Sequence, residues 1–537
     1  MRWDLSLGRL SNDQSATLSP MKPSDRRAPD GSHPRSTHAV ENAATGNFWV
    51  LIAAILGSSL AFIDGTVVNI ALPAIQSGLH ATSRDLQWVV ESYALSLASL
   101  LLVGGSFGDS YGRKMVFLFG TVLFAIGSAW CAFVGSIEGL IAARTVQGIG
   151  AAFLVPGSLS LISSGYPPST RGRAIGTWSG FTAMMGAGGP VLGGWLVEHF
   201  SWRSVFVLNL PLAALVVGIT LWRVNESKNE KLDKALDWSG ALLASIGLGG
   251  ITYALIEASE KASGVLAVAS AGVIALIAFL IREARCPAPM VPLALFKSRT
   301  FAGANLITFF LYSGLGGILY FLPFTLIQIH HYSAAEAGAA LLPLILIIFV
   351  LSRWTGGLVA TYGARAPLTV GSIIVAAGFA LLAWPGVGGS YLKTFFAPVV
   401  VLGLGMAICV APLTTSVMNA VPENQSGVAS GVNNAISRVA GLLAVAVFGL
   451  VLSVLFNKSL DVHLLPLGLS QAMQRQVNEQ RALLGAAVNP DARVMEATRE
   501  SFVFGFRVIV LIASSLALAS AISAWLLLDH DKKRRRP

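Results

Sequence analysis

Fourteen apolar stretches, each about as long as a membrane-spanning helix, follow one another along this chain of 537 residues. A helix that crosses roughly 30 Å of hydrocarbon needs about 20 apolar residues. The stretches cover residues 49–76, 86–107, 116–135, 138–164, 173–197, 204–222, 238–257, 264–281, 301–327, 335–359, 367–385, 393–418, 427–456 and 502–528. We therefore expect a chain that is folded in a lipid bilayer.

The composition agrees with this expectation. Hydrophobic residues make up 54% of the chain and charged residues only 12%, whereas a soluble globular protein carries about 25% charged residues. So few charges cannot cover a water-facing surface of ordinary polarity. The sequence also lacks the short alternating segments of about 10 residues that are typical of a membrane β-barrel. It predicts an all-α integral membrane protein.

Lysine and arginine residues gather in alternate loops, which predicts the orientation of the chain. If the amino end is cytoplasmic, the inner loops hold Arg113, Lys114, Arg171, Arg173, Arg223, Lys228, Lys231, Lys234, Arg282, Arg285, Lys297, Arg299 and Arg365. The short outer loops hold Arg84, Arg203, Lys261 and Lys393. Both ends are then cytoplasmic: a disordered tail at 1–47 and a basic tail at 529–537. The net charge of +10 reflects this orientation rather than nucleic-acid binding.

Two similar turns predict an internal repeat. The stretch GGSFGDSYGRK at 104–114 ends the second span, and TGGLVATYGAR at 355–365 ends the tenth. Two halves related by such a repeat are a common transporter architecture, although chance similarity of glycine-rich turns is the alternative. The expected parts are a six-helix half at 48–222, an inserted helix pair with linkers at 223–300, and a six-helix half at 301–528 that includes an outer loop at 457–500.

Asp64 is a carboxylate within the first span, in the stretch AFIDGTVVNIALP at 61–73, where burying its charge is energetically unfavourable. A charge at the centre of a bilayer costs at least ~2.5–3.5 kcal/mol. The side chains one helical turn away from Asp64 are all apolar: Leu60, Ala61, Val67 and Val68. Compensation must therefore come from another helix or from water.

Arg144 is a second costly residue, about two turns inside its span, with Gln147 on the same helix face. Its charge could extend to the outer interface. Alternatively, it could face a carboxylate. Helix geometry allows Asp64 to be that carboxylate, since it places Arg144 and Asp64 within roughly 10 Å in depth. Glu91 is a weaker candidate, as an interfacial carboxylate or as a group for proton access or cation recognition. For Arg507 we favour helix packing or anchoring, and for Arg438 the role stays open.

Several motifs together resemble one transporter family. AFIDGTVVNIALP is similar to its first-span signature, GGSFGDSYGRKM to its turn signature, and RTVQGIGAA at 144–152 to its fourth-span signature. GAGGPVLGGWL at 186–196 is similar to the fifth-span signature of antiporters, and SWRSVFVLNLP at 201–211 is a further family-like stretch. The chain resembles the major facilitator superfamily from about 48 to 528, and more narrowly the fourteen-span drug:proton antiporters of the EmrB/QacA type.

The resemblance implies a major-facilitator-like fold with 14 transmembrane helices, arranged as two six-helix halves plus an inserted helix pair. It implies a conformational latch in the turn motif, formed by Gly105, Asp109, Gly112, Arg113 and Lys114; an orientation-setting basic loop is the alternative. It also implies a flexing, closely packed helix in the antiporter motif. The residues of that helix are Gly186, Gly189, Pro190, Gly193 and Gly194.

Proton coupling is the function that the resemblance and the buried charges predict. Burial disfavours an ionised carboxyl and a nearby arginine favours it, so a group that alternates between the two environments can bind and release a proton. We expect Asp64, Arg144 and Glu91 to do so; a neutral Asp64 that only joins helices is the alternative. The expected activity is multidrug efflux of amphipathic or cationic compounds by alternating access. A dedicated exporter of one metabolite, antibiotic or siderophore, and a proton-coupled importer, are the alternatives.

Aromatic rings suit organic cations, and the expected substrate cavity contains Asn69, Tyr93, Gln147, Phe309, Tyr312 and Tyr320. The sequence shows no metal-ligand spacing and no phosphate-binding loop of the Walker type. We therefore expect no enzyme, no metal and no cofactor, with a proton gradient as the energy source. The expected partners are a small-molecule substrate, protons and the lipid bilayer of the inner (plasma) membrane, without nucleic acid. Periplasmic or outer-membrane partners stay open.

Overall fold

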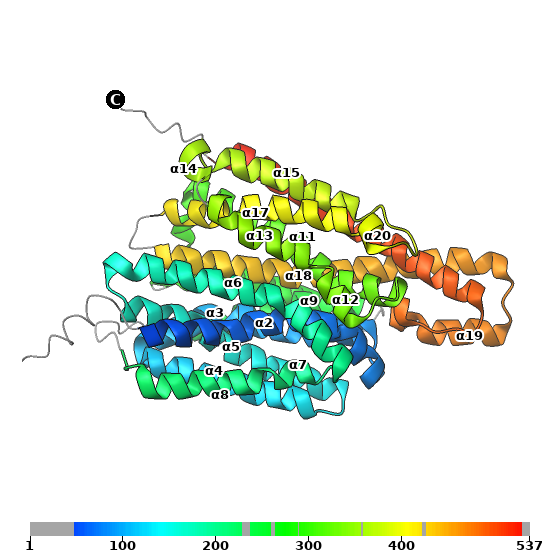
Figure 1. The fold of residues 1–537 in the computed structure, drawn as a ribbon, viewed down its shortest axis with the longest axis horizontal. Coiled ribbons are helices and arrows are strands. Elements are labelled where there is room, and N and C mark those ends of the chain that lie inside the picture. The colour runs from blue at the N-terminus through cyan, green and yellow to red at the C-terminus, as the bar shows by residue number, and fades with distance from the viewer. Residues whose placement is uncertain are drawn as a thin grey trace, which may run out of the picture. The chain divides into compact units, whose positions relative to one another are not determined.

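The computed structural model describes residues 48–227, 237–258, 264–287, 289–355, 358–421 and 426–528. Its long elements are helices that run side by side (Figure 1). They are α2 (Phe48–Leu79), α3 (Ser83–Tyr111), α4 (Arg113–Phe133), α5 (Ile137–Gly165), α6 (Pro168–His199), α7 (Ser204–Val207), α8 (Asn209–Arg223), α9 (Trp238–Glu257), α10 (Val265–Arg285), η2 (Leu293–Lys297), α11 (Arg299–Phe324), η3 (Thr325–Ile329), α12 (Ala334–Ala339), α13 (Leu342–Thr355), α14 (Leu358–Tyr362), α15 (Arg365–Leu381), α16 (Tyr391–Thr394), α17 (Phe396–Asn419), α18 (Ser426–Leu464), η5 (Leu465–Leu467), α19 (Gln471–Gln480), η6 (Arg481–Ala486) and α20 (Ala492–Leu527).

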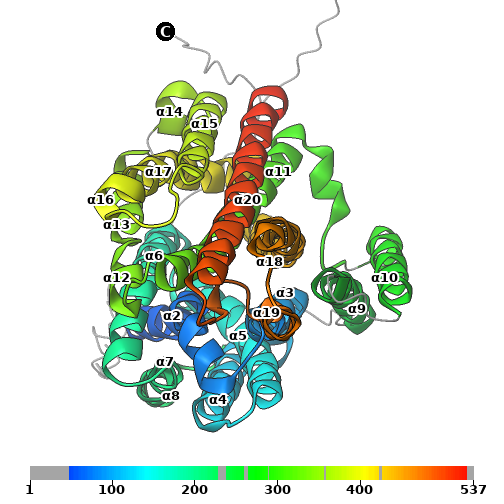
Figure 2. The same ribbon diagram turned by 90° about the vertical axis from the view of Figure 1, so that its right-hand side faces the viewer.

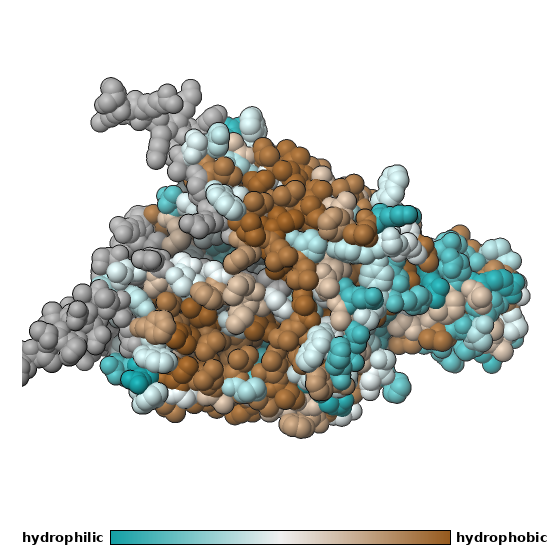
Figure 3. Space-filling model, viewed as in Figure 1, coloured by the Kyte–Doolittle hydropathy of each residue, from teal (hydrophilic) through white to brown (hydrophobic). Residues whose placement is uncertain are grey.

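Each of the fourteen predicted spans falls on one of these helices or on consecutive shorter ones. Among the described residues, 11 helices are long and apolar enough to cross a membrane. Helices α3 and α6 are not among the 11, and α15 is apolar but shorter. Apolar side chains cover the middle of the surface in Figure 3. The chain is thus an all-helical, multi-pass membrane protein, and the number fourteen stays a prediction.

Helices α2 to α8 form one group and α11 to α20 form another, as Figure 2 shows from the side that bears α19. We call the end with α19 the cap end, and the end with Phe48 and Leu527 the terminal end. Small residues allow the close helix contacts within each group. A Cβ atom on Gly127 of α4 would lie 2.7 Å from the backbone nitrogen of Gln147 in α5, so glycine is required there.

Helices α9 and α10 lie beside the two groups (Figure 2). Helix α9 packs against α3, α18 and α10. Asp237 caps α9 and pairs with Arg282 of α10 at 2.7 Å. Burial alone would raise the pKa of Asp237, but hydrogen bonds from the Gly240 N–H, Arg282 and Ser239 hold that pKa below its usual value. Helices α9 and α10 therefore form a packed helical hairpin, and its insertion between two six-helix halves stays a prediction.

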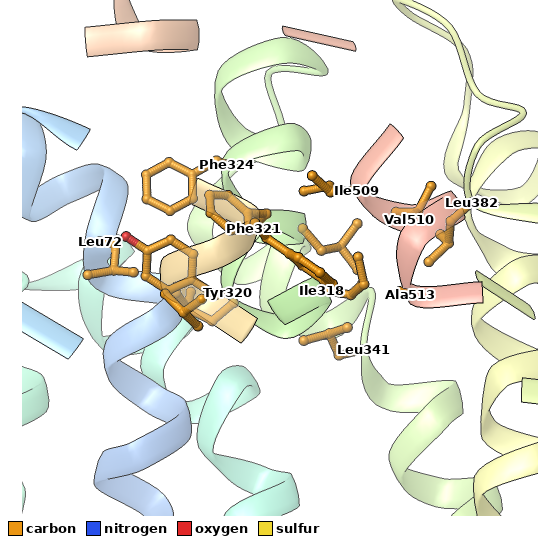
Figure 4. Packing of buried hydrophobic residues seen from close by; sticks show 14 of the residues in the cluster. Leu72, Ile318, Tyr320, Phe321, Phe324, Leu341, Leu382, Ile509, Val510 and Ala513 are labelled. Atoms are coloured by element: carbon orange, nitrogen blue, oxygen red, sulfur yellow. The ribbon is translucent and has the colours of Figure 1, made fainter. Parts of the chain in front are cut away.

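The two groups contact each other through α2 with α11, α3 with α18, and α6 with α12 and α13. Near the cap end, Gln328 donates a hydrogen bond to Gln76 at 2.8 Å, and Gln76 donates to the Leu483 carbonyl of η6 at 3.4 Å. Figure 4 shows Tyr320 of α11 extending toward Leu72 of α2 within a shared apolar core. The cap-end halves of the two groups are thus joined.

The stretch at 457–500 differs from the expected loop because most of it is helical. Helices α18 and α20 have 39 and 36 residues, and at 1.5 Å per residue each extends roughly 50–60 Å, well beyond the bilayer core. Val477 of α19 packs into the apolar cluster that also contains Phe456 and Leu460. Arg481 pairs with Asp461. This small core orders polar residues that the apolar pattern assigned to a loop.

Candidate functional site

Asp64 lies in a closed polar cluster inside the first group of helices. Its side chain is 0% exposed. Its Oδ2 accepts a hydrogen bond from Arg144 at 2.5 Å, and its Oδ1 accepts from Gln147 at 2.8 Å and from Asn209 at 3.1 Å. The compensation that the sequence requires therefore comes from α5 and α8, and Asp64 contacts Arg144, its candidate partner.

Arg144 is held in place on every side. Its Nε donates to the Val89 carbonyl at 3.2 Å, and its NH1 also donates to Gln147 Oε1 at 2.7 Å. The guanidinium lies over the Tyr93 ring, 4.2 Å from the centroid. Its side chain is 1% exposed, so it does not extend to the interface as in the alternative reading. Arg144 is a buried cation with a buried counter-ion.

Ser128 of α4 connects the amides around Asp64. Asn209 donates to the Ser128 hydroxyl at 2.9 Å and Gln147 donates to it at 3.3 Å. The hydroxyl in turn donates to the Phe206 carbonyl at 2.9 Å. Four helices, α2, α4, α5 and α8, thus meet at one carboxylate through a hydrogen-bonded network.

The hydrogen bonds of this cluster stabilise a negative charge on the Asp64 carboxylate. All three side chains that contact Asp64 donate hydrogen bonds to its carboxylate oxygens. A charge-assisted bond to arginine is among the strongest available to a carboxylate. Adding a proton to Asp64 would remove the charge that Arg144 faces, so the two protonation states favour different packings of these helices.

Glu91 lies in α3 and is 0% exposed, which differs from an interfacial position. Neither of its carboxyl oxygens has a hydrogen-bond partner among the described residues. Glu91 is thus buried within α3, a helix that contacts α18 of the other group.

The turn motif joins α3 to α4 at the terminal end. Gly112 has φ of +119° and its counterpart Gly363 has φ of +73°, a backbone conformation that favours glycine. This agreement supports the predicted repeat. The surroundings of Gly105 and the side chain of Asp109 fall outside the described part of the structure, so this carboxylate of the predicted latch is not described.

Glu226, which follows α8, clamps this turn. Its carboxylate accepts hydrogen bonds from the backbone N–H groups of Lys114 at 3.0 Å and Met115 at 3.1 Å, at the start of α4. The Arg113 N–H donates to the Ser227 carbonyl at 3.1 Å. A carboxylate at a helix N-terminus is favoured by the helix dipole. The turn is thus held to the end of α8.

The antiporter-motif helix, α6, packs closely on both of its neighbours. Thr66 of α2 donates to the Gly186 carbonyl at 2.8 Å. A Cβ on Gly193 would meet Val67, and a Cβ on Gly194 would meet the backbone of Ala334 in α12. The motif therefore brings α6 against α2 of its own group and against α12 of the other group. Pro190 lies within the helix, at the same contact.

The residues expected to line a substrate cavity do not form one set. Gln147 and Tyr93 are buried against Asp64 and Arg144, and Tyr320 is buried in the apolar core. Phe309 and Tyr312 of α11 are half-buried. The side-chain amide oxygen of Asn69 is buried and has no hydrogen-bond partner among the described residues.

Three functional positions were missed by sequence reasoning. Ser128 is an ordinary small residue of an apolar span, and Glu226 is one charge among many in a polar linker. Asn209 lies within the family-like stretch SWRSVFVLNLP, where a polar amide inside an apolar run was a usable signal. No group of three or more His, Cys, Asp or Glu side chains that could hold a metal ion occurs among the described residues.

Comparison with known proteins places the chain in a family. The Major Facilitator Superfamily profile matches residues 54–445. The tetracenomycin C resistance and export protein of Streptomyces glaucescens is 32% identical over 520 residues, covering 93% of this chain and 95% of that protein. The multidrug resistance protein Stp of Mycobacterium tuberculosis (strain CDC 1551 / Oshkosh) is 32% identical, covering 90% and 92%.

Solved structures show the same fold. A bacterial homologue of the human lysosomal transporter Spinster, in an inward-facing and occupied conformation, matches with a TM-score of 0.60 at 18% identity, over 89% of this chain and 96% of that chain. A D-xylose–proton symporter matches with a TM-score of 0.55 at 14% identity, over 90% and 98%. The chain therefore belongs to the Major Facilitator Superfamily and is a transporter rather than an enzyme.

Proposed function

We propose that this chain is a proton-coupled exporter of amphipathic organic compounds that works by alternating access. We assign it to the fourteen-span drug:proton antiporters of the EmrB/QacA type, with the α9–α10 hairpin as the pair inserted between two six-helix halves. Its place is the plasma membrane, with both ends in the cytoplasm. The proton gradient supplies the energy, and no bound cofactor takes part.

The buried Asp64 cluster is the observation that supports this proposal. An ionised carboxylate at this depth is tolerated only while Arg144 and the amides of Gln147 and Asn209 remain in contact with it. When a proton binds, that requirement disappears and the helices can repack. A group with two protonation states and two preferred packings lets proton binding shift the equilibrium between two conformations.

The contacts between the helix groups suggest how this shift moves the substrate. In this structure the groups are joined near the cap end by Gln76 and Gln328, and by α6 with α12. Rocking of one half against the other would break these contacts and close the terminal end. The Glu226 clamp on the turn at Gly112 is the proposed latch of the terminal end. Glu91, buried in a helix that contacts the other half, is the proposed second proton site.

The names of the relatives favour export, and they are compatible with either a single exported compound or several. Several are named for a single compound, such as methylenomycin A in Bacillus subtilis and puromycin in Streptomyces alboniger. Others are named for multidrug resistance. A dedicated exporter of one compound is therefore the second candidate. Susceptibility of a deletion strain and an overexpressing strain to a panel of dyes, quaternary cations and antibiotics separates the two.

Transport in proteoliposomes tests the coupling. A pH gradient and a membrane potential are imposed separately, and uptake of a compound from the panel is followed for the wild type, Asp64→Asn and Asp461→Asn. Asp461 is the matched control because it lies in the cap, outside the bilayer core. We expect the pH gradient to drive uptake by the wild type and the control but not by Asp64→Asn. Uptake at the wild-type rate by Asp64→Asn would show that the proton binds elsewhere.

A further inference from the structure

Arg438 is a half-buried cation within the predicted span 427–456, and no counter-ion faces it among the described residues. It lies 12 residues after Ser426 in α18, which places it roughly 18 Å along the helix. No hydrogen bond or ion pair joins its side chain to another residue in the described part of the chain. Its observed partner is the ring of Phe62 in α2, whose centroid is 5.2 Å from the guanidinium carbon.

Arg144 shows how this chain normally compensates a buried arginine. It has the Asp64 carboxylate, a glutamine oxygen and a backbone carbonyl as acceptors. Among the described residues Arg438 has none of these, although ionisable residues within membrane segments normally pair or face a water-filled space. Asp64 already pairs with Arg144. The guanidinium of Arg438 is therefore available to a bound anion.

The face of α18 that carries Arg438 is polar and accessible. Ser430, Asn434 and Ser437 share that face at helical spacing, and Asn434 is exposed. A methyl group added to Gly441, further along the same face, would meet no atom within 4 Å, and the same holds for Gly65 of α2. Open space therefore borders both α2 and α18 near the contact between Phe62 and Arg438.

Aromatic groups from both halves surround this position. Tyr312 lies in α11 and Tyr93 lies in α3, and both of these helices pack against α18. Tyr93 also packs on Arg144, and Phe62 precedes Asp64 by two residues in α2. The cation, the rings and the open space therefore adjoin the Asp64 cluster and lie between the two halves.

We propose that Arg438 binds an anionic group of the exported compound, a carboxylate or an ionised phenol or enol, while Phe62 and Tyr312 contact its rings. This inference rests on the proposed export function and names the substrate class of the central site. A guanidinium binds carboxylate oxygens through two parallel hydrogen bonds. An organic cation would be repelled there, so this site would favour anionic members of the amphipathic compounds expected from the sequence.

Two dyes with the same ring system and opposite charge test the proposal. The anion 5-carboxyfluorescein and the cation rhodamine 6G are titrated against purified full-length protein, and binding is followed by fluorescence anisotropy. We expect the wild type to bind the anion more tightly. Arg438→Gln should weaken binding of the anion by roughly ten- to a hundredfold, because a hydrogen bond to a charged group is lost. Binding of the cation should be unchanged or tighter.

Two further variants complete the experiment. Arg507→Gln makes the same chemical change in α20, where Arg507 contacts the Pro385 carbonyl near the cap end, and should bind both dyes like the wild type. Arg438→Lys keeps the positive charge but lacks the paired donors, so it should weaken binding of the anion several-fold. If Arg438→Gln does not fold, the anion affinity of Arg438→Lys tests the proposal instead. Wild-type binding that favours rhodamine 6G, no binding of carboxyfluorescein, or equal binding by Arg438→Gln would overturn the proposal. Because binding needs no gradient, these results are independent of the coupling test on Asp64.

Discussion

Replacing Arg144 by glutamine would leave the Asp64 carboxylate without its counter-charge. The wild-type pair is almost completely buried, with the arginine side chain 1% and the aspartate 0% exposed. Asp64 would keep only the amide donors of Gln147 and Asn209. Removing one partner of a buried ion pair costs about 3–5 kcal/mol because an uncompensated charge remains.

The corresponding change in melting temperature follows from the size of the chain. Unfolding entropy is about 2 cal/mol/K per residue, so the roughly 490 residues of the folded part give about 1 kcal/mol per degree. Arg144→Gln should therefore lower the apparent melting temperature in detergent by about 3–5 °C. Asp64→Asn/Arg144→Gln has no buried charge in the pair and should recover most of this loss. Neither variant should couple transport to protons.

The double variant makes the reasoning refutable. If the cost of Arg144→Gln comes from the stranded carboxylate, removing that carboxylate must restore stability. A double variant as unstable as Arg144→Gln would mean that Arg144 acts through packing on Tyr93 and through Val89 rather than through Asp64.

Three further changes test other parts of the account. Asn209→Ala removes a donor to Asp64 and should cost about 1.5–3 kcal/mol, measured by thermal unfolding; a change no larger than that of a surface substitution would contradict the network. Glu226→Ala removes the clamp on α4, should cost at most about 1 kcal/mol, and should slow transport in vesicles; transport at the wild-type rate would exclude a latch. Gly194→Ala places a methyl group against the backbone of Ala334 and should impair both stability and transport. Gly188→Ala in the same helix is the control, because its methyl group meets open space. Equal effects of the two substitutions would argue against close packing of α6 on α12.

The sequence predicted the helices well because a bilayer imposes a length of about 20 apolar residues on each span. It identified Asp64 and Arg144 as a candidate pair because the free-energy cost of burying each charge is evident from its own apolar span. It could not place Asn209 or Ser128 beside them, because these contacts join helices that are far apart in the chain. It also could not show that α18 and α20 continue into the cap, since the apolar pattern ends where the bilayer ends.

The role of Arg438 also could not be predicted from the sequence. In sequence, an arginine inside an apolar span is compatible with packing, anchoring or a site. Its meaning depends on what the other helices offer it. The described part of the chain offers the Phe62 ring and no acceptor, a combination that no single span reveals.

Proton movement driven by the exported compound tests the central claim most directly. Proteoliposomes are loaded with a compound that the susceptibility panel identifies, diluted into medium without it, and the internal pH is followed with a trapped dye. The account predicts that the wild type moves protons inward as the compound leaves, and that Asp64→Asn exchanges the compound across the membrane without moving protons. Proton movement by Asp64→Asn at the wild-type rate would contradict the assignment of Asp64 as the coupling site.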